Sequence, residues 1–156
     1  MNKFILAGVV GCFLLIGPIV CYADTWDKSD FKDESVESAF FDKNSIKALG
    51  KTISWTEKFI LTKDGAKSVT QKLSNFQACK QSINKNGDVA QYQQDFEVKG
   101  VKASIIEARY YNKDNEMLCT DKDEGKKEIT WSRILKHPRL QKIYYELLTK
   151  YKNILN

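Results

Sequence analysis

The hydrophobic period of this chain changes near its C-terminal end, and the change limits the folds open to it. Between residues 35 and 120, apolar and polar side chains alternate in several short segments, which is typical of half-buried strands. After His137-Pro138 the apolar residues recur at helical spacing, from Leu140 through Leu147 to Tyr151. One amphipathic helix after antiparallel strands must cover their apolar face. The sequence therefore predicts an α+β fold with this helix packed on one face of the sheet.

Turn residues divide the predicted sheet into strands. We expect strands over 35–41, 52–61, 90–98, 102–111 and 116–120. The last two form a hairpin whose turn is Asn112-Lys113-Asp114-Asn115. Trp55 on one strand and Leu147 on the helix are expected to face each other in the core.

Two parts of the pattern are irregular. Glu57 interrupts the apolar positions of the strand over 52–61, which predicts a bulge or a twist of this strand out of the core. Lys63-Asp64-Gly65 is then expected to form a turn. The following segment, Ser68 to Ile83, fits a helix as well as a strand, and we favour strand character around Cys79.

The first 23 residues predict export. Lys3 precedes an uncharged apolar run, and Ala23 supplies a small residue before the polar segment that Asp24 opens. We expect cleavage between Ala23 and Asp24, which leaves one domain over residues 24–156. An uncleaved anchor is the alternative, because the apolar run approaches the roughly 18 residues of a membrane span. A lipid anchor is less favoured: Cys12 comes early and more apolar sequence follows it, and Cys21 follows Val20, where a small residue is needed.

Removal of the leader leaves two cysteines, Cys79 and Cys119, in the chain. An oxidising compartment favours a disulfide, and two cysteines allow one intramolecular connectivity. Closing a loop of about 40 residues stabilises a fold by roughly 4 kcal/mol on the chain-entropy model. We therefore expect a structural Cys79–Cys119 bridge.

The charge pattern argues against nucleic acid as a partner. The formal net charge is +5, but the lysines are dispersed among acidic residues rather than gathered in one stripe. Arginine, which recognises planar anionic groups well, occurs only at Arg109, Arg133 and Arg139. The pattern indicates a solvated surface.

Residues for catalysis or metal binding are sparse. His137 is the single histidine and lies at a predicted helix start, where a capping or surface role is expected. The segment Asn112 to Met117 begins like a calcium loop but has Met117 where the bend requires Gly. The acidic cluster of Asp121, Asp123 and Glu124 has no matching distal carboxylate. We expect no enzyme activity, no bound metal and no cofactor.

Paired tyrosines predict a contact surface for a partner. In Tyr110-Tyr111 and Tyr144-Tyr145, strand or helix geometry sends one ring to the core and leaves the other outside. Tyr and Arg are favoured at the centres of interfaces. The candidate contact residues are Arg109, Tyr111, Lys113 and Tyr145.

The order of several short motifs resembles the surface-adhesin E family of small exported bacterial proteins. The motifs are Ala39-Phe40-Phe41-Asp42, Trp55, Cys79, the run from Ala108 to Asn115, and Trp131-Ser132-Arg133-Ile134. The resemblance implies a curved antiparallel sheet under the terminal helix and a binding role, with host matrix proteins as ligands of the best-known members. Asn115 stands where that family has Gly, and the helix lacks a cysteine common among relatives, so the disulfide is not placed by analogy. No binding residue is transferred, because the binding role is not established for most of the family.

These inferences predict an exported, non-enzymatic binding module, a candidate surface adhesin in the periplasm or at the cell surface. Its expected partner is an extracellular-matrix or envelope protein. A periplasmic accessory subunit of an envelope complex is an alternative that sequence does not separate from adhesion. A small hydrolase that uses His137 is a further, less favoured alternative.

Overall fold

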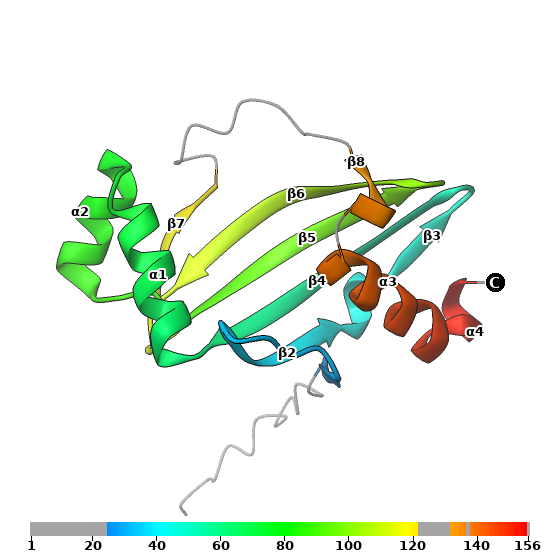
Figure 1. The fold of residues 1–156 in the computed structure, drawn as a ribbon, viewed down its shortest axis with the longest axis horizontal. Coiled ribbons are helices and arrows are strands. Elements are labelled where there is room, and N and C mark those ends of the chain that lie inside the picture. The colour runs from blue at the N-terminus through cyan, green and yellow to red at the C-terminus, as the bar shows by residue number, and fades with distance from the viewer. Residues whose placement is uncertain (1–24, 122–131, 137, 156) are drawn as a thin grey trace, which may run out of the picture.

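The computed structural model describes residues 25–121, 132–136 and 138–155 (Figure 1). The predicted cleavage point at Ala23 and Asp24, and His137, lie outside these residues. The elements in chain order are β1 (Trp26–Ser29), β2 (Val36–Asp42), η1 (Lys43–Ser45), β3 (Lys47–Leu49), β4 (Thr52–Leu61), α1 (Lys63–Leu73), α2 (Gln77–Asn86), β5 (Gln91–Lys99), β6 (Lys102–Tyr111), β7 (Met117–Thr120), β8 (Ser132–Arg133), η2 (Ile134–Lys136), α3 (Pro138–Lys150) and α4 (Lys152–Leu155).

The strands form one antiparallel sheet in the order β1-β2-β4-β5-β6-β7, with β3 also paired to β4 and β8 to β6 (Figure 1). The expected strands and the α+β class are confirmed, and β1, β3 and β8 are additions to them. The long central strands β4, β5 and β6 are neighbours in the sheet, and each pairs antiparallel with the next. Curvature of the sheet stays a prediction.

The C-terminal helix covers one face of the sheet, as the helical period predicts. Ile143 and Leu147 of α3 are buried in the same core as Trp55 of β4. The Trp55 ring stacks between Phe96, at 5.1 Å between ring centroids, and Tyr144, at 6.1 Å. The predicted placement of Trp55 and Leu147 in the core between strand and helix is confirmed.

Two helices replace the predicted strand around Cys79, so that prediction is wrong. The Thr62 hydroxyl accepts a hydrogen bond from the Gly65 backbone N–H at 3.1 Å, and this cap starts α1 where a turn was expected. Gly87, with φ of 91°, ends α2. A side-chain cap thus begins α1, whereas α2, which contains Cys79, begins after Phe76 without one.

Glu57 does not mark a bulge or an outward twist. Strand β4 runs through it in unbroken register, with Phe41 of β2 on one side and Gln94 of β5 on the other. The whole residue is 0% exposed. The carboxyl group therefore occupies a core position between apolar neighbours on its own strand.

The predicted disulfide between Cys79 and Cys119 is confirmed, with 5.3 Å between the Cα atoms. It joins α2 to β7 and closes a loop that contains β5 and β6. A disulfide of this kind indicates a non-reducing environment. In the part of the chain that the structure describes, no helix has both the length and the apolar character needed to cross a membrane.

The predicted hairpin between β6 and β7 is organised by one side chain. Asn112 accepts hydrogen bonds from the backbone N–H groups of Asp114 and Glu116, both at 2.9 Å. Asn115 takes a left-handed conformation, with φ of 63°, which Asn tolerates better than most residues. The polar residues that resemble a calcium loop thus build a turn.

Candidate binding surface

The sheet has two unlike faces. Trp55, Glu57 and Phe59 point to the core face, where α1, α2 and α3 pack. Alternation along the strands sends the intervening residues to the other side, which we call the open face. Its members include Trp26, Phe40, Thr56, Lys58, Ile60, Gln93, Asp95, Glu107, Arg109 and Tyr111, all half-buried.

A cross-strand row on the open face joins aromatic and cationic groups. Phe40 is the partner of Lys58, Lys58 of Gln93, and Gln93 of Arg109. The Lys58 ammonium lies 4.4 Å from the Trp26 ring centroid and 5.1 Å from that of Phe40. This geometry gives a favourable cation–π contact. Side chains from β1, β2 and β4 thus form one aromatic and cationic surface.

Arg109 is held by a bidentate ion pair. Its two terminal nitrogens donate to the two Asp95 carboxylate oxygens, each at 2.7 Å, and one also reaches Glu107 at 3.0 Å. Burial alone would raise the pKa of Asp95, but the hydrogen bonds from Arg109 and Thr56 outweigh it and hold this pKa below its usual value. Conversely, the hydrogen bond with Asp95 raises the pKa of Arg109. The guanidinium is therefore fixed in position on the open face.

The four residues predicted to contact a partner fall into two places. Tyr111 follows Arg109 by two positions on β6, so both occupy the open face, and Lys113 is exposed in the adjoining turn. Tyr145 is 56% exposed on α3, which covers the opposite face of the sheet. The structure brings Arg109, Tyr111 and Lys113 together and places Tyr145 apart from them.

The core face holds a polar cluster that sequence reasoning missed. The guanidinium of Arg139, in the first turn of α3, lies 4.6 Å from the Phe59 ring and 4.8 Å from the Phe31 ring. It donates a hydrogen bond of 2.6 Å to the Tyr92 hydroxyl and lies 3.7 Å from the Asp33 carboxylate. Burial raises the pKa of Tyr92, so its hydroxyl stays neutral. Arg139 thereby anchors the start of α3 on the sheet.

Glu57 lies within this core region. Neither of its carboxyl oxygens has a hydrogen-bond partner among the described residues. Burial raises its pKa well above the usual value and Glu146 adds to that shift, while Arg139 and the Trp55 side chain oppose it. The sequence signal was its in-phase position between Trp55 and Phe59. Complete burial keeps the group from direct contact with a substrate in this conformation.

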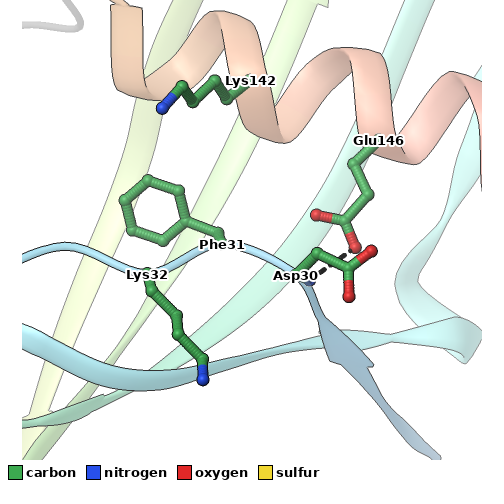
Figure 2. Close-up of a pocket in the computed structure, with 5 residues that line it drawn as sticks. All are labelled: Asp30, Phe31, Lys32, Lys142 and Glu146. Carbon is green, nitrogen blue, oxygen red and sulfur yellow. Dashed lines mark hydrogen bonds between the residues drawn. The ribbon is translucent and has the colours of Figure 1, made fainter.

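Described residues line two hollows beside α3. Figure 2 shows the larger, about 320 Å³, where Lys142 and Glu146 of α3 stand over the loop residues Asp30, Phe31 and Lys32. The Glu146 carboxylate accepts hydrogen bonds from the Asp30 backbone N–H at 2.8 Å and from the Ser29 hydroxyl at 2.7 Å. Its charge is therefore engaged in holding this loop against the helix.

The second hollow, about 200 Å³, lies between α1 and α3. Its lining residues are Ser35, Leu61, Val69, Lys72, Leu73, Tyr92, Gln94, Tyr110 and Arg139. Tyr92 and Tyr110 are cross-strand partners in its floor, and the Tyr92 hydroxyl is already engaged by Arg139. The lining is aromatic and aliphatic with cationic groups on both helices.

Comparison of the chain with protein-family models, with curated proteins and with solved structures found no match. The resemblance to the surface-adhesin E family therefore stays a prediction. The candidate surface is defined by the geometry of the open face alone.

Proposed function

We propose that this chain is an exported, non-enzymatic binding module that recognises a protein partner with the open face of its sheet. The observation that carries the proposal is the group of Trp26, Phe40, Arg109 and Tyr111 on the face opposite the helices. Aromatic residues and Arg are enriched at the centres of protein interfaces and supply most of their binding energy.

The fixed side chains of the open face support this proposal. The ion pair between Arg109 and Asp95 and the contact of Lys58 with Trp26 restrict rotamers before a partner arrives. Association loses free energy for every flexible side chain that it immobilises. A surface whose side chains are already ordered therefore loses less free energy when it binds a partner.

The disulfide and the predicted leader support a location of the protein outside the cytosol. A Cys79–Cys119 bridge suits the periplasm or the cell surface. The partner proposed is an extracellular-matrix protein, as for an adhesin of the surface-adhesin E type, or another envelope protein. The test must include both kinds of partner.

The test compares Tyr111→Ala with Tyr145→Ala. Surface plasmon resonance would measure binding of the folded protein to immobilised collagen, laminin and fibronectin and to solubilised envelope proteins. We expect Tyr111→Ala to weaken binding about tenfold or more, as for a central interface residue. Tyr145→Ala is the matched control, since it removes an exposed ring from the other side of the molecule. Both variants should keep the thermal midpoint of the wild type.

Two outcomes would overturn the proposal. Equal affinity of Tyr111→Ala and wild type for every partner would remove the open face from the site. Reproducible hydrolase turnover that His137→Ala abolishes would place the chain among enzymes instead.

A further inference from the structure

Two hairpin turns lie side by side at the end of the sheet away from α1 and α2 (Figure 1). Gly50 begins the turn between β3 and β4, with φ of 58°, and Gly100 begins that between β5 and β6, with φ of 60°. Glycine at the first central position suits a tight two-residue turn. The Gly100 backbone N–H donates to the Lys51 carbonyl at 3.3 Å, so the two turns are in contact.

The last cross-strand row before these turns gathers positive charge. Thr52 is the partner of Lys99, Lys99 of Lys102, and Lys102 of Arg133. Opposed residues of antiparallel strands share a face and lie close together, and like charges in such positions destabilise a sheet. Glu97 offsets part of this charge through its 2.7 Å ion pair with Lys99. A surface that retains this repulsion is suited to an anionic partner.

Apolar side chains project at the same place. Leu49, the partner of Thr52 in β3, is 83% exposed, and Val101, in the second turn, is 66% exposed. They are the two most exposed large apolar residues of the described chain. We call the combined surface the basic hairpin end. It comprises Leu49, Lys51, Lys99, Val101, Lys102 and Arg133, all exposed.

We propose that the basic hairpin end docks on an anionic lipid surface, with Leu49 and Val101 entering the headgroup region and the cations contacting lipid phosphates. Lys is depleted from protein interfaces, so this composition fits a protein partner poorly. A soluble polyanion would engage the cations but gain nothing from exposed aliphatic tips. Membrane surfaces reward both kinds of group together, since buried apolar area and electrostatic attraction add.

This docking uses another end of the molecule than the proposed protein contact. Lys99, Lys102 and Arg133 share the open face with Arg109 but lie at its hairpin end. The two surfaces differ in composition, and Tyr111 lies at the far end of β6 from Lys102. Binding to lipid through the hairpin turns leaves Arg109 and Tyr111 available to a protein. A Tyr111→Ala variant should bind vesicles as the wild type does, so failure of one proposal leaves the other intact.

The test is flotation with vesicles. Protein would be purified from the envelope of cells that express the full chain, and intact mass would confirm that every variant has the same N-terminus. Vesicles of phosphatidylcholine mixed with phosphatidylglycerol would be compared with vesicles of phosphatidylcholine alone. The variants are a tip variant, Leu49→Ser with Val101→Ser, and a charge variant, Lys99→Gln with Lys102→Gln.

We expect the wild type to float with the anionic vesicles only, and added salt to weaken its binding. Each cation near an anionic surface contributes about fivefold in affinity, so the charge variant should lose about 25-fold. The tip variant should lose about tenfold through its smaller apolar area. Lys67→Gln with Lys80→Gln, exposed on α1 and α2, is the control for net charge and should bind as the wild type does.

Stability provides an independent check of the charge variant. Removal of the repulsion between Lys99, Lys102 and Arg133 offsets loss of the exposed Lys99–Glu97 ion pair, so the thermal midpoint should be preserved while lipid binding falls. If the tip variant binds as tightly as the wild type while the charge variant does not, the surface recognises a soluble polyanion and the proposal is wrong. Equal vesicle binding by all variants would also overturn it.

Discussion

At the residue scale, Glu57 shows how a polar residue can follow the apolar period without leaving the core. Its Cα partners, Phe41 and Gln94, fix it in the sheet, and the next core-facing residues on its strand are Trp55 and Phe59. Burial strongly disfavours a charged carboxylate in such a place, whereas the neutral acid is tolerated better. The raised pKa of Glu57 therefore means that folding keeps a proton on this group.

Glu57→Gln should change the pH dependence of stability. The unfolded chain ionises Glu57 above about pH 4.3 while the folded chain does not, so the free energy of unfolding falls as pH rises. The fall ends once pH passes the raised pKa of the folded state. Gln has no proton to lose. As pH rises between these two pKa values, the free energy of unfolding of the variant should therefore increase relative to that of the wild type.

Urea denaturation at a series of pH values measures this difference. Glu37→Gln, which removes an exposed carboxylate from β2, is the control for the loss of one carboxylate. A difference between Glu57→Gln and wild type that stays constant from acid to neutral pH would show that the burial of Glu57 does not control its titration.

At the element scale, helix α1 depends on a close approach of two backbones. The Ser35 carbonyl accepts a hydrogen bond from the Thr62 N–H at 3.0 Å, just before the helix begins. A Cβ atom at Gly65 would lie 2.1 Å from this same carbonyl oxygen. Glycine therefore lets the first turn of α1 sit against the loop between β1 and β2.

Gly65→Ala should destabilise the fold by about 1–3 kcal/mol, as for other substitutions that overfill a packed site. The effect opposes helix propensity, which favours Ala over Gly by about 1 kcal/mol. Chemical denaturation would measure it, with Lys67→Ala on the exposed side of α1 as the control. A Gly65→Ala protein more stable than the wild type would show that the loop with Ser35 moves away from the added methyl group without loss of stability.

A comparison of the central strands with α1 and α2 explains where prediction from sequence succeeded and where it failed. Alternation was strong in β4, β5 and β6, and those strands were predicted with close boundaries. In α1 only Gly65 and Leu73 are buried, and in α2 only Cys79 and Ile83, so the apolar stripe is too thin to distinguish helix from strand. Capping by Thr62 was the available signal.

Only the part of the open face that lies on one strand was predicted from sequence. Arg109 and Tyr111 are two residues apart on one strand, so strand geometry alone places them on one face. Trp26 and Lys58 join that face through the pairing of β1 with β2 and of β2 with β4. Strand order and register arise from the whole fold, and local patterns do not contain them.

At the scale of the whole molecule, the disulfide fastens the helical end of the sheet. Cys79 on α2 and Cys119 on β7 are 40 residues apart in sequence, and both are buried. Replacing both by Ala should lower the free energy of unfolding by about 4 kcal/mol, because the unfolded chain regains the conformational entropy that a closed loop of this length removes. Urea denaturation would measure the loss.

Wild-type protein treated with a reductant is the matched comparison for the double variant, since both lack the bridge. Reduced wild type and the Cys79→Ala, Cys119→Ala protein should unfold at similar denaturant concentrations, below the oxidised protein. Coincident unfolding of all three would contradict a stabilising role for the bridge.

The strands at the margins of the sheet are all short. On one side lie β1, of 4 residues, and β3, of 3, and on the other β7, of 4, and β8, of 2. A long exposed edge would offer a row of backbone donors and acceptors to a second copy, which is how sheets aggregate. Among the described residues, β2 and β3 cover the outer side of β4, β1 covers that of β2, and β7 and β8 pair with β6. The marginal strands therefore offer another copy only short stretches of backbone with which to extend the sheet.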